Sequence, residues 1–210
     1  MIVVPRLYAI VDAAFFPSTQ ALMIFFDELV AGGCTLLQYR NKSGNARVML
    51  QQAPELKRRS RARAPAPHLP KLVMNDRADL CLAAEFDGVH VGQDDLSPES
   101  VRRIIGPDRW LGVSTHNSSQ LQAADRTSAD YLAIGPVFST SSKEKPDPVV
   151  GLEGIRQARS LTRKPLVAIG GITRANAASV IEAGADSVAV ISDLIREPRK
   201  SAEEFLRILR

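Results

Sequence analysis

Eight short apolar runs, spread evenly along the chain, constrain the fold more than any other feature of the sequence. Each run is rich in Val, Ile and Leu, and the eight occupy residues 7–12, 35–40, 71–76, 88–92, 110–115, 131–138, 166–171 and 187–192. Near-continuous apolarity over such a length is typical of strands that are buried on both faces, as in a parallel sheet. Amphipathic segments with a helical period lie between the runs, for example 21–31, 46–59 and 176–183. The chain therefore alternates strand and helix.

Eight strands that alternate with helices predict an α/β fold, a single (β/α)8 TIM barrel over residues 1–210. Dividing 210 residues by eight leaves about 26 residues for each βα unit, which is compact for such a barrel. A doubly wound open sheet is the competing fold, but no G-x-G-x-x-G motif follows the first apolar run. Pro54 lies inside the segment 46–59 and predicts that this helix is kinked or split.

Composition narrows the class of protein. Hydrophobic residues make up 45% and charged residues 24%, as in an ordinary globular chain. No apolar run reaches the roughly 18 residues that a membrane span needs, and no secretory signal precedes the first strand. Cys34 and Cys81 lack metal-ligand spacing and fall in apolar segments. We therefore expect a cytoplasmic protein with buried, reduced thiols and no membrane contact.

The net charge of +4 suits an anionic partner, and the densest basic stretch is residues 57–63. A nucleic-acid patch is one interpretation of this stretch. However, no aromatic residues are interleaved to stack on bases, and no nucleic-acid motif adjoins it. A solvated helix C-terminus, where cations lie near the negative end of the helix dipole, is favoured. We expect no nucleic-acid partner.

Polar side chains gather where the predicted strands end, which is the edge at which a barrel carries its active site. Gln38, Arg40 and Lys42 alternate along the second strand, so they point to the same side. Other strand ends carry Asn75-Asp76, 92–95, 114–116, 140–143, Gly170-Gly171 and Ile191-Ser192. Each taken alone has a plain structural explanation. Arg40 and Lys42 could be a solvated strand end, Asp94-Asp95 a helix cap, the glycines a tight turn and His116 a loop residue.

Together these strand ends predict a binding site for phosphorylated ligands. Lys and Arg bind phosphate oxygens directly, whereas aspartate carboxylates hold Mg²⁺. Backbone N–H groups after the seventh and eighth strands of such a barrel commonly form a second phosphate site. Two anion sites imply two phosphorylated substrates, or one substrate that carries phosphate at both ends.

The ordered motifs resemble those of the thiamine phosphate synthase family, from residue 7 to about residue 195. The resemblance rests on Gln38-x-Arg40-x-Lys42, Asn75-Asp76, the motifs in 88–95 and 112–116, Asp130-Tyr131, the motif in 135–138, Lys143 and the motif in 169–172. The family joins hydroxymethylpyrimidine diphosphate to a thiazole phosphate and releases pyrophosphate. These two small molecules are thus the implied partners, and Mg²⁺ is the implied cofactor.

The resemblance also implies a role for each matching residue. Asp76 and Asp95 would bind Mg²⁺. Ser114 would form a hydrogen bond with the departing pyrophosphate, and Arg40, Ser114 and Lys143 would be the catalytic residues. The diphosphate would be held by Gln38, Arg40, Lys42, Asn75 and Lys143. The thiazole phosphate would be bound by Thr140, Ser141, Ser142, Gly171, Ile191 and Ser192.

The sequence departs from the family at one point. The family typically has Thr-x-Thr-Lys, whereas this chain has Thr140-Ser141-Ser142-Lys143. Serine keeps the hydroxyl group, so we expect phosphate binding to survive. Ser, Lys and Pro residues in 139–150 predict a lid that brings Lys143 to the leaving group.

Three alternatives to the synthase stay open. A related thiazole tautomerase would need no diphosphate site and would use His116 as acid or base. A non-catalytic barrel would sense a phosphorylated ligand. Nucleic-acid binding is the least favoured hypothesis. No Ser–His–Asp set or reactive thiol indicates covalent catalysis. The sequence leaves open whether the chain forms a homo-oligomer.

Overall fold

The eight strands form a closed parallel barrel in which each strand pairs with the next along the chain and β8 pairs with β1. The structure is a computed structural model that describes residues 2–63, 69–140 and 147–210. The strands are β1 (Leu7–Asp12), β2 (Leu36–Arg40), β3 (Lys71–Asn75), β4 (Gly88–Val91), β5 (Trp110–Thr115), β6 (Tyr131–Ile134), β7 (Leu166–Ile169) and β8 (Ser187–Val190). The predicted (β/α)8 barrel is confirmed.

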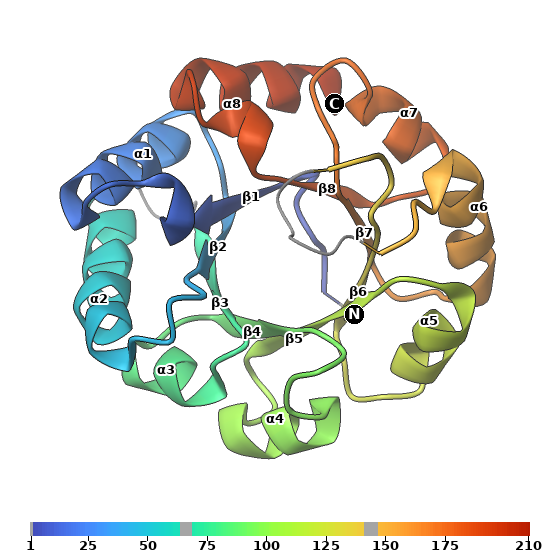
Figure 1. Cartoon of the computed structure of the whole chain (residues 1–210), viewed down its shortest axis with the longest axis horizontal. Helices are drawn as coiled ribbons and strands as arrows, with labels where there is room; N and C mark the ends of the chain where they lie inside the picture. Colours follow the sequence, from blue (N-terminus) through green and yellow to red (C-terminus); the bar gives the residue numbers. More distant parts are fainter. Residues whose placement is uncertain (1, 64–68, 141–146) are drawn as a thin grey trace.

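Helices surround the strands in a ring, as Figure 1 shows in a view down the barrel. They are α1 (Thr19–Ala31), α2 (Ala46–Arg63), α3 (Ala78–Ala83), α4 (Pro98–Ile105), α5 (Ser118–Asp125), α6 (Gly151–Leu161), α7 (Ala177–Glu182) and α8 (Pro198–Ile208), with 3-10 turns η1 (Ala13–Phe15) and η2 (Ser192–Leu194). Among the described residues, no helix combines the length and apolarity that a membrane crossing requires.

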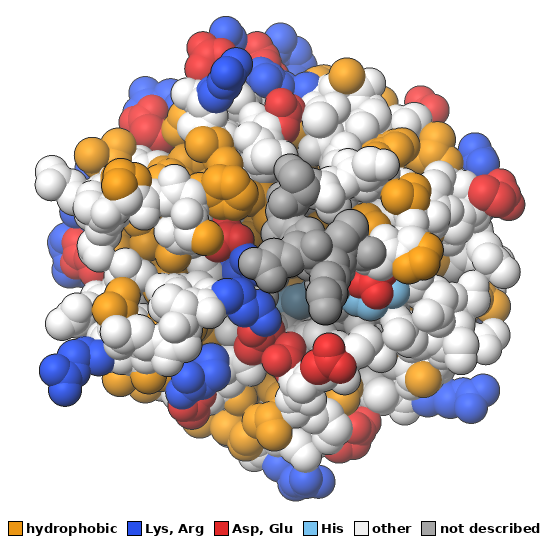
Figure 2. Space-filling view, in the orientation of Figure 1, with side chains coloured by type: hydrophobic (Ala, Val, Ile, Leu, Met, Phe, Trp, Pro, Cys, Tyr) orange, Lys and Arg blue, Asp and Glu red, His pale blue; other side chains and the backbone are white. Residues whose placement is uncertain are grey.

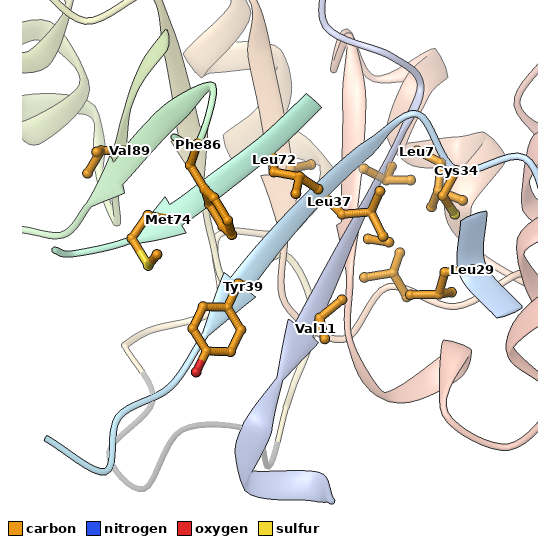
Figure 3. Close-up of a cluster of buried hydrophobic side chains, with 14 of the residues drawn as sticks. Leu7, Val11, Leu29, Cys34, Leu37, Tyr39, Leu72, Met74, Phe86 and Val89 are labelled. Atoms are coloured by element: carbon orange, nitrogen blue, oxygen red, sulfur yellow. The ribbon is translucent and has the colours of Figure 1, made fainter. Parts of the chain in front are cut away.

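The alternation of side chains along each strand builds two apolar clusters. Outward-facing residues such as Leu7, Leu37 and Leu72 pack against the helices, and Figure 3 shows part of this outer cluster. Inward-facing residues such as Tyr8 and Val73 fill the barrel interior. Successive side chains of a strand point to opposite faces, so one set packs against the helices and the other fills the barrel interior. Both faces are therefore buried, and this explains the near-continuous apolar runs of the sequence.

Three aspartates brace the amino-terminal end of the barrel. Each lies directly before β4, β6 or β8. Its carboxylate accepts a hydrogen bond of 2.8 Å from the N–H of a leucine near the start of the neighbouring odd-numbered strand, β3, β5 or β7. The same carboxylate forms an ion pair with a basic residue of a helix. The three sets are Asp87 with Leu72 and Lys57, Asp130 with Leu111 and Arg102, and Asp186 with Leu166 and Arg159. These carboxylates stabilise the end of the barrel opposite the strand C-termini.

The basic segment 57–63 forms the C-terminal part of α2, as the helix-end interpretation predicts. Its charges are extensively paired. Arg59 binds Asp27 at 2.5 Å and also Glu55, and Arg63 binds Asp27 at 3.0 Å. Cations that are already paired with carboxylates attract a phosphate backbone less, so the pairing favours a structural role for this segment.

Some element ends differ from the sequence-based expectation. β6 ends at Ile134, short of the predicted 138, because Pro136 has no N–H to continue the ladder. β7 ends at Ile169, because Gly170 and Gly171 take φ angles of 99° and 65°. The sequence predicts a kink or a split at Pro54, and helix α2 continues through this residue, so it is not split there. Pro54 is exposed, so water can satisfy the carbonyl group that a proline leaves unpaired.

Both cysteines are free and buried, as predicted. Burial raises the pKa of each thiol to about 12, so neither is a thiolate at neutral pH. Cys81 is further held by hydrogen bonds from its sulfur to the carbonyl groups of Phe86 and Gly88. The thiols therefore serve packing, and the site chemistry must come from other groups.

Candidate active site

The carboxyl ends of the strands surround a pocket of about 480 Å³. The described residues that the sequence assigned to the site line this pocket: Gln38, Arg40, Lys42, Asn75, Asp76, Asp95, Ser114, Thr140, Gly171, Ile191 and Ser192. Figure 2 shows basic and acidic side chains side by side near the centre of this face, next to a histidine. Ser141, Ser142 and Lys143, with half of the predicted lid, lie outside the described residues.

Two cations stand on one wall, and each contacts a carboxylate. The Arg40 guanidinium at the end of β2 pairs with Asp12 at the end of β1, and the Asp12 side chain is only 2% exposed. Lys42 Nζ lies 2.5 Å from the Asp76 carboxylate, and the Lys42 side chain is 53% exposed. The buried carboxylate of Asp12 thus fixes the Arg40 guanidinium in place, whereas the exposed Lys42 side chain can leave Asp76 at little cost in free energy.

Asp76 and Asp95 form a pair of facing carboxylates. Burial raises the pKa of Asp76; the bond from Lys42 lowers it, and the neighbouring Asp95 raises it again. Asp76 has a φ of 62°, a left-handed conformation that aspartate tolerates better than most residues. Asp95 Oδ2 accepts the Gly92 N–H at 2.7 Å, which fixes its orientation. Two carboxylates that oppose each other's ionisation are favourable together only with a cation between or beside them.

This pair fits Mg²⁺ held jointly with a substrate. Among the described residues, no group of three or more His, Cys, Asp or Glu side chains is arranged to hold a metal by itself. Mg²⁺ is usually bound through one or two carboxylates together with substrate phosphates and water, unlike zinc in an all-protein site. Two carboxylates beside two cations therefore match a metal that arrives with a phosphorylated ligand.

Asn75 supplies a donor on the same wall. It is 8% exposed, and within the part of the chain that the structure describes its Nδ2 makes no hydrogen bond. A buried amide donor without a partner costs free energy, which an anionic oxygen in the pocket would offset. The residue type and its place beside Asp76 support the sequence-based assignment to a phosphate ligand.

A chain of hydrogen bonds leads through the barrel interior to Ser114. The sequence motifs contain Gln38, His90, Ser114 and Tyr131, but nothing in the sequence indicated that these side chains are bonded to one another or to Tyr8. Gln38 Nε2 donates to the Tyr8 hydroxyl at 2.8 Å, and the Tyr8 and Tyr131 hydroxyls are 3.0 Å apart. The Tyr131 hydroxyl is 3.0 Å from His90 Nδ1, and His90 Nε2 is 2.7 Å from Ser114 Oγ. Burial lowers the pKa of His90 to about 4, although the charge of Asp95 opposes this shift. The imidazole is therefore neutral at pH 7.

Asp94 and His116 lie at the edge of the pocket. Asp94 and Asp95 follow the end of β4 in a turn, where the alternation of a strand no longer applies. Neither Asp94 nor Asp95 caps α4, whose N-cap is Ser97. His116 Nδ1 is 2.7 Å from the Gly135 carbonyl oxygen and 3.5 Å from Asp147. A nitrogen that contacts a carbonyl oxygen carries the proton, so in the neutral ring Nε2 is the unprotonated nitrogen of His116.

The opposite end of the pocket is built from backbone. Gly171 has a φ of 65°, and a Cβ atom there would lie 2.6 Å from the Ser139 carbonyl oxygen. Only glycine lets the loop after β7 approach the loop after β6 so closely. Ile191 and Ser192 follow β8 and border the same end. The sequence predicts an anion held by main-chain N–H groups at this end.

Comparison with known proteins agrees with this arrangement. A family model described as thiamine monophosphate synthase matches residues 7–194. The chain belongs to the thiamine monophosphate synthase family. The resemblance drawn from the sequence motifs is confirmed, and with it the assignment to a transferase family. The match spans every strand of the barrel and all of the pocket-lining residues.

Members of the thiamine monophosphate synthase family resemble the chain over nearly its whole length. The thiamine-phosphate synthase of Koribacter versatilis is 62% identical over 208 residues, covering 98% of this chain and 96% of the relative. That of Chloroflexus aurantiacus is 44% identical and covers 90% and 85%. The solved thiamine phosphate pyrophosphorylase from Pyrococcus furiosus has a TM-score of 0.84 at 32% identity, covering 97% of this chain and 95% of that one.

Proposed function

We propose that the chain joins hydroxymethylpyrimidine diphosphate to hydroxyethylthiazole phosphate, forming thiamine phosphate and pyrophosphate. The observation that carries this proposal is the wall on which Arg40, Lys42 and Asn75 stand beside the carboxylates of Asp76 and Asp95. A tautomerase or a passive sensor of a monophosphate has no use for this combination. A reaction that expels a diphosphate needs all of it, because negative charge accumulates on the leaving group.

The reaction is a substitution at carbon. The bond between the pyrimidine methylene carbon and the diphosphate oxygen breaks, and its electron pair leaves with the pyrophosphate. The pyrimidine ring bears the transient positive charge until the lone pair of the thiazole nitrogen forms the new C–N bond. Arg40, Lys42 and Asn75 bind the diphosphate oxygens, and Ser114 donates a hydrogen bond to the same group. Bound Mg²⁺, held by Asp76 and Asp95, would neutralise charge on the pyrophosphate.

The pocket floor protects the cation from water. Ile10, Ala133, Val167 and Ala189 belong to the apolar cluster inside the barrel and line the pocket, and they offer no nucleophile to a carbocation. Exclusion of water also strengthens the interaction of the fixed donors with the leaving group. We assign the thiazole phosphate to the backbone around Gly171 and Ile191-Ser192, together with Thr140. Ser141, Ser142 and Lys143 keep the roles that the family resemblance implies for them.

The proposed function predicts a metal-dependent release of pyrophosphate. Purified protein incubated with both substrates and Mg²⁺ should release one pyrophosphate for each thiamine phosphate formed. Omitting Mg²⁺ or either substrate should reduce release to background. A phosphate-release assay coupled to pyrophosphatase, with thiamine phosphate measured by chromatography, checks both products. Isomerisation of a thiazole precursor without pyrophosphate release would identify the tautomerase, and ligand binding without turnover would identify the sensor.

Gly171→Ala should weaken thiazole phosphate binding selectively. The new methyl group would meet the Ser139 carbonyl oxygen and the Phe138 side chain, so the two loops must separate. We expect the KM for the thiazole phosphate to rise about tenfold or more, while the Kd for magnesium pyrophosphate stays within about twofold. Gly44→Ala, at a positive φ of 73° but with nothing within 4 Å of the added atom, is the matched control. Equal effects of both variants on the two ligands would contradict the assignment.

The remaining sequence-based expectations accompany this proposal. We propose a single domain over residues 1–210, a cytoplasmic location and no nucleic-acid partner. A mobility-shift assay at physiological salt tests the last of these, and a specific complex would contradict it. A homo-oligomer is a further proposal, which sedimentation of the purified protein tests.

A further inference from the structure

The hydrogen-bond chain from Gln38 to Ser114 has a direction, because each of its groups has a limited supply of protons. The amide nitrogen of Gln38 can only donate, so the Tyr8 oxygen accepts from it. Tyr8 then has one proton to give, and the next group in the chain is the hydroxyl of Tyr131. Tyr131 in turn has one proton, and its next partner is His90 Nδ1. In the reversed order the Tyr8 oxygen would accept from both Gln38 and Tyr131, and the Tyr8 proton would have no acceptor within the chain. A buried donor without an acceptor costs free energy.

The same count of protons determines the tautomer of His90 and the direction of the Ser114 hydroxyl proton. If His90 Nδ1 accepts from Tyr131, then its only proton is on Nε2, which donates to Ser114 Oγ. The Ser114 oxygen is thereby an acceptor within the chain, and its own proton is left for a partner in the pocket. We infer that Tyr8, Tyr131 and His90 are positioning residues that hold the Ser114 hydroxyl as a hydrogen-bond donor directed at the ligand.

Packing holds the chain in one arrangement. Tyr8, Tyr131 and His90 are buried. Gly112 of β5 lies directly beneath them: a Cβ atom there would be 2.1 Å from Tyr131 Cζ and 2.5 Å from His90 Nδ1. The two phenol rings meet edge to face, with centroids 6.1 Å apart. The rings therefore have no room to turn away. Packing fixes the positions of the side chains, and the donors and acceptors of the hydrogen-bond chain fix the order of the protons.

The direction matters for an anionic ligand. A serine that donated to His90 would present only lone pairs to the pocket, and these would repel a phosphate oxygen. A serine that accepts from His90 presents its proton before the ligand arrives, so no reorganisation accompanies the growth of charge. This inference rests on the proposed function, because it assigns the ligand of Ser114 to the leaving pyrophosphate.

The tautomer of His90 is a direct test that needs no substrate. In protein labelled with ¹⁵N at its three histidines, a long-range ¹H–¹⁵N spectrum at pH 7 should show His90 with a protonated Nε2 and an unprotonated Nδ1. His90→Gln, which removes one set of signals, makes the assignment. In Tyr131→Phe the Nδ1 atom loses its donor, and the signals should shift towards a mixture of tautomers. A protonated Nδ1 in the unmodified protein would overturn the inference.

A double-mutant cycle tests whether Tyr131 acts through Ser114. We expect Tyr131→Phe to lower kcat and to weaken binding of magnesium pyrophosphate about tenfold each, which corresponds to about 1.4 kcal/mol. In a Ser114→Ala background the same change should alter either quantity by less than about twofold. Calorimetry provides the Kd independently of turnover. The matched control is Tyr39→Phe, whose hydroxyl donates to Gln52 Oε1 at 2.5 Å outside the chain and whose loss should leave both quantities unchanged.

Different results would overturn the positioning role of Tyr131 and the proposed function. Equal losses from Tyr131→Phe in both backgrounds would show a structural effect and would overturn the positioning role. Absence of pyrophosphate release by the unmodified protein would overturn the proposed function instead, while the histidine spectrum and the pyrophosphate-binding cycle would still decide whether Ser114 is a directed donor.

Discussion

Asp76→Asn should abolish pyrophosphate release, and added Mg²⁺ should not restore it. Asparagine keeps the shape of the side chain and tolerates the left-handed backbone at φ 62°, so the variant removes the charge with little strain. An amide oxygen is a much weaker ligand for Mg²⁺ than a carboxylate, and Asp95 alone would then have to hold the ion. Asp76→Ala should be equally inactive, with an added backbone cost. Initial rates at several Mg²⁺ concentrations measure the effect.

Folding stability separates this loss of activity from misfolding. Burial raises the pKa of Asp76, so the ionised carboxylate lowers the free energy of unfolding at pH 7, and this penalty disappears below the carboxyl pKa of the unfolded chain. Without Mg²⁺, the thermal midpoint of Asp76→Asn should therefore equal or exceed that of the unmodified protein at pH 7. Asp79→Asn, an exposed carboxylate on α3, is the matched control and should keep full activity. Near-normal turnover by Asp76→Asn would refute the metal assignment.

The convergence of the strand ends was predictable because it depends on a local period. Gln38, Arg40 and Lys42 are two residues apart, and all three line the pocket. Asn75 and Asp76 reach the same wall because β3 pairs with β2. Asp94 and Asp95 lie beyond the end of β4, so the period no longer applies to them, and both line the pocket. Alternation predicts a side chain's direction only within the ladder.

The contacts that hold the site could not be predicted from spacing. Tyr8, Tyr131 and His90 come from β1, β6 and β4, which are brought together only when the barrel closes with a particular register. In the sequence each residue lies inside a predicted strand, and although His90 and Tyr131 belong to motifs of the family resemblance, nothing there indicates that the three side chains meet. Asp12 was likewise read as the end of the first strand, although it pairs with Arg40 across the β1–β2 ladder. Long-range pairing of this kind depends on register and closure, which no local window contains.

Arg40→Ala should impair both activity and stability, through two separable causes. The variant removes a cation that faces the leaving group, and losses of this kind cost about a hundredfold to a thousandfold in kcat. It also leaves Asp12, whose side chain is 2% exposed, without its charged partner. Breaking a buried pair costs about 3 kcal/mol here, the lower end of the usual range, because Asp12 keeps a bond from the Ala14 N–H. The thermal midpoint should fall by about 6–12 °C.

A second substitution should separate these two causes. In Asp12→Asn/Arg40→Ala the buried side chain is neutral, so most of the lost stability should return, while kcat should stay as low as in Arg40→Ala. The matched control is Arg156→Ala, which breaks an exposed pair with Glu153 and should change the unfolding free energy by less than about 0.5 kcal/mol. If the double variant recovers turnover together with stability, then Arg40 acts only by neutralising Asp12. If it recovers stability alone, the guanidinium belongs to the diphosphate and Asp12 is the residue that holds it there.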